Sequence, residues 1–377
     1  MAEFNSIEDL AREVKNKLTS SIVDRVKGIV AKDKKKIVAL YAFNSTGKTR
    51  LSNEFELLNN EEGEEYKYKV LCYNAFLEDL FKWDNENYIL SFEKKSWVAL
   101  LIKEEGLEGK IIDNFNTIVT SKIEPSFDLE KGEITFNIAS GDDKSTENIK
   151  SSKSEESILM WSIFYTIVET AIEVLNDEKE NRTTQKFNDL EYIIVDDPVS
   201  SIDDTKIISM AIKLIESINS STNRDVKFFI TTHHALYYNI LHNSFQRNKD
   251  YKYIGYILSK NNTALELREQ KDDTPFAYHL LVMDEIKKAI DANNIQKFHF
   301  NLFRSLLEKT ANFLGYINFE NCIKEDKREG FKRVLHLHSH GKLSELENSS
   351  VSNEDKELFK ETFNEFIRNF KYNQHDK

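Results

Sequence analysis

The stretch Ile37 to Ser52, IVALYAFNSTGKTRLS, decides the fold of this 377-residue chain. Its apolar start predicts a buried strand, and the following AFNSTGKT matches the phosphate-binding pattern G-x-x-x-x-G-K-[ST] except that Ala42 replaces the first glycine. Ala42 costs little if its φ is negative. Backbone N–H groups of such a loop point at a bound phosphate, so we expect a nucleotide there. The residues expected to bind it are Asn44, Ser45, Thr46, Gly47, Lys48, Thr49 and Arg50.

A second apolar run, residues 192–195, ends in two carboxylates, Asp196 and Asp197. We expect Lys48 to reach the β- and γ-phosphates, and Thr49 and Asp196 to hold Mg²⁺. Asp197 would then orient the water that attacks the γ-phosphate. Taken alone, two acids after a strand are more often a strand end capped by a turn.

Two further motifs stand in the order found in ABC-type ATPases. Ser152 to Glu155 (SKSE) resembles the signature motif, in which Ser152 would touch the nucleotide held by a second head, although Ser154 replaces the usual glycine. Asp203 closes a segment resembling the D-loop, and His233 ends an apolar strand as a switch histidine would. Alone, Ser152 and Glu155 could form a capping box, and His233 could be structural. Together these motifs predict an α/β ABC-type P-loop head in which Ser152, Ser154, Glu155 and Asp203 contribute to the nucleotide site and Asp197 and His233 to hydrolysis.

Composition bounds the class of protein. Two cysteines cannot form a disulfide framework, the start MAEF lacks a signal-peptide pattern, and no uncharged apolar run approaches the ~20 residues of a membrane span. We therefore expect a cytoplasmic protein with no membrane partner. The net charge of −12 argues against a nucleic-acid ligand. Residues 271–377, however, are nearly neutral, with 17 Lys and Arg against 18 Asp and Glu. A basic run there is interleaved with acids, which favours a solvated helix face; its members are Lys324, Lys327, Arg328, Lys332 and Arg333.

The motifs divide the chain into a head, residues 1–270, with a helical or irregular lobe inserted at 75–150, and a mainly α-helical C-terminal domain, residues 271–377. In the latter, the stretch 301–308 predicts a helix on which Arg304 and Glu308 lie one turn apart, although an ordinary ion pair is the common alternative. The opposite, apolar face would comprise Leu302, Phe303, Leu306, Phe313 and Leu314. Further on, His336, His338 and His340 alternate and would share a face if extended, so a metal site is one interpretation.

These motifs, with Tyr73 to Asp84 (YNAFLEDLFKWD) and Glu155 to Tyr165 (EESILMWSIFY), resemble the bacterial anticodon nucleases of the PrrC family along nearly the whole chain. In that family an Arg-x-x-x-Glu and a distant His form a metal-independent ribonuclease site. The resemblance implies that Arg304, Glu308 and His340 are catalytic, with His338 as the alternative histidine. Glu308 would take the ribose 2′-OH proton, His340 would protonate the 5′-oxygen, and Arg304 would stabilise the phosphorane, leaving a 2′,3′-cyclic phosphate and a 5′-OH.

The resemblance also implies the physiological setting. The substrate would be the anticodon loop of lysine tRNA, and the head would use ATP or GTP with Mg²⁺, with dTTP as a stabilising nucleotide and no metal at the ribonuclease site. Heads would form a homodimer or higher oligomer. A type I restriction–modification complex would silence the nuclease, and a phage-encoded anti-restriction peptide would activate it in antiviral defence.

Two other classes stay open from the residues. An ATPase of a DNA repair or defence complex without ribonuclease activity would leave Arg304, Glu308 and His340 dispensable, and would usually bring a long coiled coil, for which no sustained heptads are present. A metal-dependent nuclease effector is the second alternative.

Overall fold

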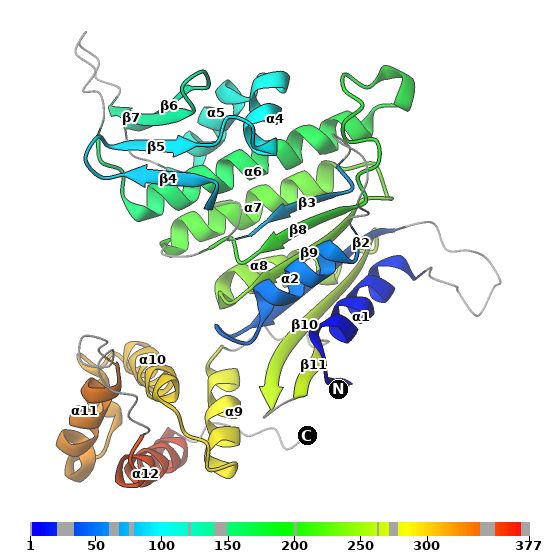
Figure 1. The fold of residues 1–377 in the computed structure, drawn as a ribbon. Coiled ribbons are helices and arrows are strands. Elements are labelled where there is room, and N and C mark those ends of the chain that lie inside the picture. Colours follow the sequence, from blue (N-terminus) through cyan, green and yellow to red (C-terminus); the bar gives the residue numbers. More distant parts are fainter. Residues whose placement is uncertain are drawn as a thin grey trace. The chain divides into compact units, whose positions relative to one another are not determined.

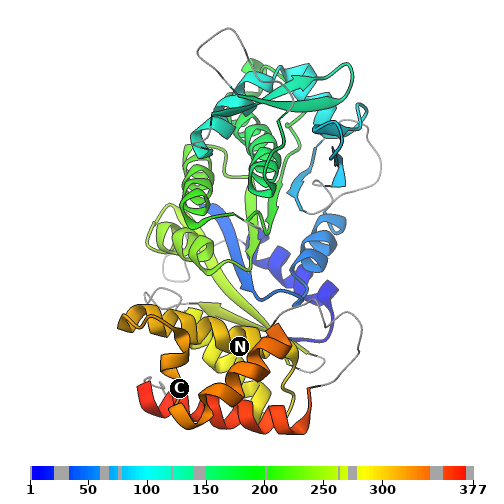
Figure 2. The same ribbon diagram turned by 90° about the vertical axis from the view of Figure 1, so that its left-hand side faces the viewer.

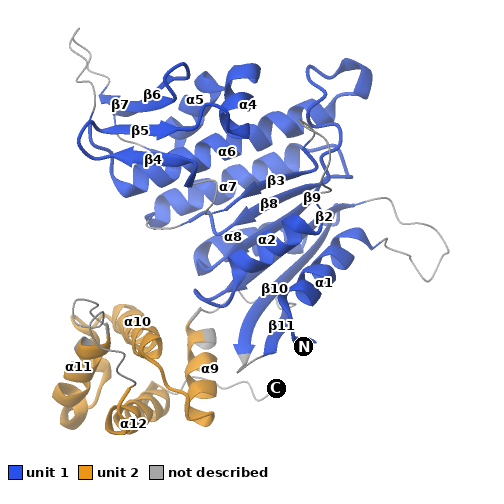
Figure 3. Cartoon of the chain, viewed as in Figure 1, with its two compact units in different colours: residues 1–275 blue, residues 276–377 orange. Residues whose placement is uncertain are grey.

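The computed structural model describes residues 2–20, 34–59, 68–74, 79–119, 122–138, 149–199, 202–261, 264–270, 278–339 and 351–370. The chain forms two compact units, residues 1–275 and 276–377, coloured separately in Figure 3.

A seven-stranded sheet forms the centre of the first unit, in the order β1-β11-β10-β2-β9-β8-β3. Neighbours from β10 to β3 are parallel, whereas β11 and β1 are added antiparallel at one edge. The strands predicted before the P-loop, at 192–195 and before His233 are all present. The strand bounds are β1 Ala2–Phe4, β2 Lys35–Ala42, β3 Val70–Tyr73, β8 Tyr192–Asp196, β9 Lys227–Thr232, β10 Tyr251–Asn261 and β11 Ala264–Gln270.

Helices cover both faces of this sheet (Figures 1 and 2). Val38 and Leu40 of β2 pack with α1 (Ile7–Thr19) and α2 (Lys48–Leu57), whereas Ile37 belongs to the larger core that includes the other helices. That alternation is the one that a strand buried on both faces requires. The other helices are α6 Lys153–Asn176, α7 Asp204–Ser220 and α8 Ala235–Gln246.

The lobe inserted between β3 and α6 differs from the prediction. It contains α4 (Trp97–Glu105) and α5 (Glu108–Ile118), as a helical lobe would, but also a four-stranded antiparallel sheet in the order β4-β5-β7-β6 that the prediction missed. Ile134 and Phe136 alternate with less buried neighbours and pack into the main core, which stabilises strands too short to stand out alone. The bounds are β4 Phe81–Asp84, β5 Ile89–Phe92, β6 Ile123–Asp128 and β7 Glu133–Ile138.

Helix α6 begins in the predicted signature segment, Ser152 to Glu155. It is long and apolar enough to cross a membrane by length and composition, but 83% of its apolar window is buried inside the protein. Its apolar residues do not form one uncharged run of membrane-spanning length, because Glu169 and Glu173 interrupt them. Its burial between other elements identifies it as a core helix of the head. A 3₁₀ turn, η1 (Lys179–Asn181), lies in the polar segment that follows.

The second unit is helical and is held by a cluster of phenylalanines. Its elements are α9 Tyr278–Asp291, α10 Lys297–Leu314, η2 Phe319–Cys322, α11 Glu325–Ser339 and α12 Asn353–Phe370. The interior rings, each at most 1% exposed, are Phe300, Phe303, Phe331, Phe359, Phe363 and Phe366. The basic run lies on an ion-paired surface, where Lys327 meets Glu361 at 2.8 Å and Lys332 meets Glu320 at 2.7 Å.

One prediction for this unit was wrong in part, and the condition for another is not met. Phe303 and Leu306 of α10 are buried, but Phe313 and Leu314 are 89% and 42% exposed, because Thr310 and Ala311 continue the buried face instead. The segment containing His336 and His338 is helical rather than extended, so positions 336 and 338 do not share a face. His340 lies outside the described residues. Within the described part of the chain, no three His, Cys, Asp or Glu side chains are grouped to hold a metal.

Candidate functional site

The P-loop connects the end of β2 to α2. Gly47 has φ +110°, a conformation that side chains rarely adopt, and caps the helix whose first N–H groups face the loop. Ala42 is the last strand residue and is not among those with positive φ, so the missing glycine carries no strain. Ser45 also has positive φ, +64°. The loop therefore has the conformation that brings backbone N–H groups and a helix N-terminus to one anion.

Lys48 points into this loop with only 5% of its side chain exposed. Its ammonium donates to the carbonyl oxygens of Ala42 and Phe43 at 3.2 Å each and to Asn44 Oδ1 at 3.4 Å. It also lies 3.4 Å from Asp197 Oδ2. The cation is thus held between the loop and the carboxyl end of β8, where a nucleotide phosphate would meet it.

Asp196 is the carboxylate best suited to a divalent cation. It is 3% exposed, and its Oδ1 accepts a short hydrogen bond from Thr231 Oγ1. Burial raises the pKa of Asp196, against the opposing hydrogen bonds from Thr231 and Thr49. A buried carboxylate beside the Thr49 hydroxyl supplies the hard oxygen ligands that Mg²⁺ prefers, so these two residues fit a magnesium nucleotide.

Asp197 joins the P-loop to His233. Its φ of +51° is left-handed, and its Oδ1 accepts from the backbone N–H of His233 at 3.0 Å and lies 2.6 Å from His233 Nδ1. Burial acts to raise the pKa of Asp197, but the hydrogen bonds and charge of His233, with the charge of Lys48, outweigh it and hold that pKa below its ordinary value. A charged carboxylate is therefore fixed between Lys48 and His233.

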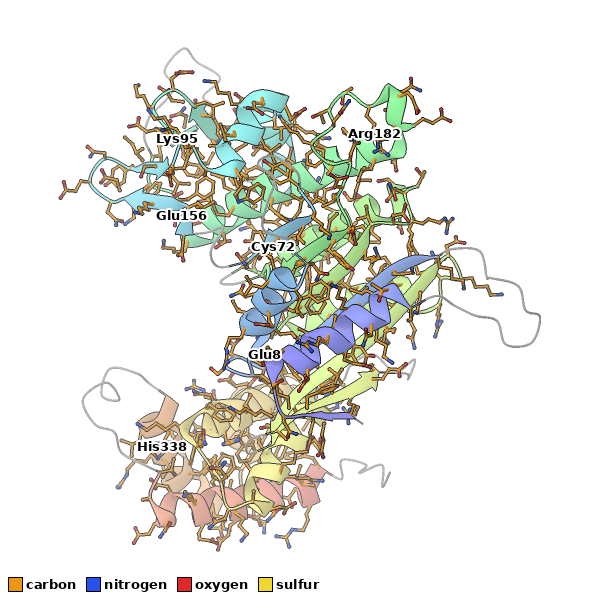
Figure 4. All side chains as sticks on the ribbon, turned by 45° about the vertical axis from the view of Figure 1, so that its right-hand side comes forward. Glu8, Cys72, Lys95, Glu156, Arg182 and His338 are labelled. Atoms are coloured by element: carbon orange, nitrogen blue, oxygen red, sulfur yellow. The ribbon has the colours of Figure 1, made fainter. Side chains whose placement is uncertain are left out.

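Two threonines that the sequence analysis did not select complete this cluster. Thr231 bonds to Asp196, and Thr232 Oγ1 lies 3.5 Å from Asp197 Oδ1. The signal that could have found them is the parallel pairing of β8 with β9, in which Asp196 stands opposite Thr231. Cys72 of β3 is labelled in Figure 4. Burial raises the pKa of its thiol, and the carboxylates of Glu56 and Asp196 raise it further.

The signature and D-loop residues serve as helix caps in this structure. Ser152 and Glu155 form a reciprocal capping box on α6, with Ser152 N–H donating to Glu155 Oε2 at 2.8 Å, and the neighbouring Glu156 is labelled in Figure 4. Asp203 caps α7 and accepts from Lys206 N–H at 3.2 Å. Hydrogen bonds from the side chains of Thr205 and Lys206, of which the first has the larger effect, lower the pKa of Asp203 to about 2. The capping interpretation is therefore confirmed, and a role of these residues and of Ser154 at a nucleotide stays a prediction.

The C-terminal unit presents Arg304 and Glu308 on α10. Arg304 Nε donates to Glu308 Oε1 at 2.9 Å, their side chains are 27% and 46% exposed, and the guanidinium lies 5.5 Å from the Phe319 ring centroid. The pair is partly exposed and lies within the regular helix α10. His338 is described and bonds to Asp355, whereas His340 is not among the described residues. The three-residue ribonuclease site thus stays a prediction.

Comparison with known proteins places these motifs in a family. No family model matches the chain. It is 38% identical over 330 residues to the curated "Anticodon nuclease" of Escherichia coli, a match covering 82% of this chain and 83% of that protein. The chain belongs to the anticodon nuclease family. The resemblance drawn from its motifs is confirmed, and as a member of the anticodon nuclease family the chain is an enzyme.

Among solved structures, this chain matches one described as "Crystal structure of the SmcHead bound to the C-winged helix domain of ScpA". The TM-score is 0.34 at 11% identity, and the match covers 59% of this chain and 61% of that chain. A likeness at this level carries no argument. The assignment of the first unit as a P-loop head stands instead on its own sheet, loop and carboxylates.

Proposed function

We propose that this protein is a nucleotide-gated endoribonuclease that cuts the anticodon loop of a tRNA. The 38% identity to an anticodon nuclease over most of both chains carries the proposal. Two observations support it: Lys48, Asp197 and His233 converge at the carboxyl ends of three neighbouring strands, and a separate helical unit presents Arg304 and Glu308. A P-loop head supplies gating, and the helical unit supplies the cutting site.

In the head, ATP or GTP would bind with its phosphates on the P-loop and Lys48, with dTTP as a stabilising nucleotide. Mg²⁺, held by Thr49 and Asp196, would neutralise phosphate charge. Asp197 would orient the attacking water, because it is a charged carboxylate fixed by His233 beside Lys48. His233 would hold this carboxylate in place, in the position of a switch histidine.

In the helical unit, Glu308 would act as the base that takes the ribose 2′-OH proton. The Arg304 guanidinium, fixed beside it, would stabilise the doubly charged phosphorane, and His340 would protonate the leaving 5′-oxygen. These steps need no metal at this site and give a 2′,3′-cyclic phosphate and a 5′-OH. An anticodon loop suits such a site because its unpaired bases can be splayed out.

The finer proposals follow from family resemblance. The tRNA would be lysine tRNA, two heads would sandwich the nucleotides, and a type I restriction–modification complex would keep the nuclease silent until a phage-encoded anti-restriction peptide releases it. The protein would then act in antiviral defence within the cytoplasm.

The experiment that tests this function is sequencing of RNA ends after expression of the chain without a silencer. We expect new ends within the anticodon loop of lysine tRNA, carrying a 2′,3′-cyclic phosphate and a 5′-OH. Unchanged RNA would favour a repair or defence ATPase without ribonuclease activity. New 5′-phosphate ends would instead indicate attack by water, as in metal-assisted hydrolysis.

Mixing two inactive variants tests whether the heads act as a sandwich. Lys48→Ala removes the phosphate cation of one site, and Ser152→Arg blocks an exposed helix start expected to face the partner's nucleotide. Each variant alone should have no intact site, whereas a mixed dimer should regain one composite site and about half of wild-type NTP hydrolysis. Phosphate release from mixtures with confirmed mixed dimers is the measurement. Equal loss in mixtures and single variants would contradict the sandwich.

A further inference from the structure

A hydrogen-bonded contact joins His338 of α11 to Asp355 of α12. His338 Nε2 lies 3.0 Å from Asp355 Oδ2, and the two side chains are only 7% and 20% exposed. By contrast, Lys327 and Glu361, which join the same helices, are 27% and 60% exposed. Surface pairs of that kind contribute little to stability and geometry, whereas a polar pair withdrawn from water holds a fixed geometry because breaking it is costly.

Both members of this pair are held in place from other directions. Asp355 lies in the first turn of α12, where its backbone N–H donates to Ser352 Oγ at 3.1 Å. The His338 ring, labelled in Figure 4, packs on Phe300 of α10 with 4.6 Å between ring centroids. The pair therefore connects three helices, α10, α11 and α12, at one point.

That point is next to the part of α10 that carries Arg304 and Glu308. Phe300 precedes Arg304 by four residues, which places both on one side of the helix about 6 Å apart along its axis. Phe359, one turn after Asp355, packs on Phe300 at 4.6 Å and on Phe303, the residue before Arg304, at 5.4 Å. The start of α12 thus supports the turn of α10 from which Arg304 extends.

From this geometry we infer that Asp355 is a positioning residue of the ribonuclease site and acts through His338. By accepting the hydrogen bond from His338 Nε2, Asp355 fixes the imidazole against Phe300 and holds the ends of α11 and α12 to the Arg304 turn of α10. Reacting groups must stay within about 0.5 Å of their productive geometry, and an error near 1 Å can lower the rate about 10²-fold. The inference rests on the proposed ribonuclease function.

The decisive variant is Asp355→Ala, which removes the acceptor for His338. We expect kcat for tRNA cleavage to fall about tenfold or more, with KM and NTP hydrolysis unchanged, because a residue that acts through His338 changes the geometry of the site and not the binding of RNA or nucleotide. Glu354→Ala is the matched control: it removes a charge from the same helix turn but is exposed, and it should cut like the wild type. Asp355→Asn keeps an acceptor oxygen at the same place and should recover most of the lost kcat.

A double-mutant cycle shows whether Asp355 acts through His338. The variant carrying His338→Ala and Asp355→Ala should lose no more activity than His338→Ala alone, because neither variant retains the hydrogen bond. Fully additive losses would overturn the inference, as would wild-type kcat in Asp355→Ala or an equal loss in Glu354→Ala. If Asp355→Ala does not fold in a thermal melt, His338→Ala alone provides the comparison, and wild-type kcat in that variant would also overturn it.

Failure of this inference can be told apart from failure of the proposed function. If the unmodified protein makes no new RNA ends, the ribonuclease function is wrong and the variants say nothing about catalysis. If it cuts and Asp355→Ala cuts equally well, the function stands and Asp355 is not a positioning residue.

Discussion

Glu308→Ala should lower kcat for RNA cleavage by about 10²–10⁴-fold, the usual contribution of a general base. Arg304→Ala should cause a comparable loss because it removes the cation beside the reacting phosphate, and His340→Ala should do so by removing the acid. NTP hydrolysis should be unchanged, since the head has its own site. Cleavage of a labelled tRNA anticodon stem-loop measures the first effect, and phosphate release measures the second.

Stability should hardly change in these variants. The Arg304 and Glu308 side chains are 27% and 46% exposed, so losing their pair should cost roughly half a kcal/mol of unfolding free energy or less. Lys309→Ala, an exposed change beside Glu308, is the matched control and should retain cleavage. Full cleavage by Glu308→Ala would show that the pair is an ordinary surface contact of α10.

Asp197→Asn should reduce NTP hydrolysis by about 10²–10⁴-fold while nucleotide binding persists. The variant is informative because Asn tolerates the left-handed conformation at this position, so the loss reports the missing charge rather than a strained backbone. Lys48→Ala should instead weaken nucleotide binding, since the cation facing the phosphates is removed. Binding of a fluorescent nucleotide and release of phosphate separate the two effects.

A matched control for the head is Asp225→Asn, the same change on an exposed turn before β9. It should hydrolyse NTP like the wild type. Normal hydrolysis by Asp197→Asn would mean that His233 and Lys48 hold this carboxylate for structural reasons, and the assignment of Asp197 as the water-orienting residue would then be wrong.

The sequence by itself determined the elements whose signals are local. The apolar run into AFNSTGKT predicted β2, the P-loop and α2, because a loop that binds phosphate needs glycine at a fixed distance from lysine. Asp196 and Asp197 were recognisable because they close an apolar strand, and the capping box of Ser152 with Glu155 because its two members are three residues apart. Each of these signals acts between neighbours in the chain, so it can be read before folding.

Only the tertiary structure decided the contacts between distant segments. The sheet β4-β5-β7-β6 is stabilised because its apolar residues pack into the larger core. Thr231 lies beside Asp196 because β8 and β9 pair in parallel. Likewise, the buried face of α10 continues through Thr310 and Ala311 and leaves Phe313 and Leu314 exposed. His338 contacts Asp355 of another helix. Periodicity shows which side of an element is apolar, but the partner that covers it, and the polar group that meets a buried histidine, depend on how the elements pack in space.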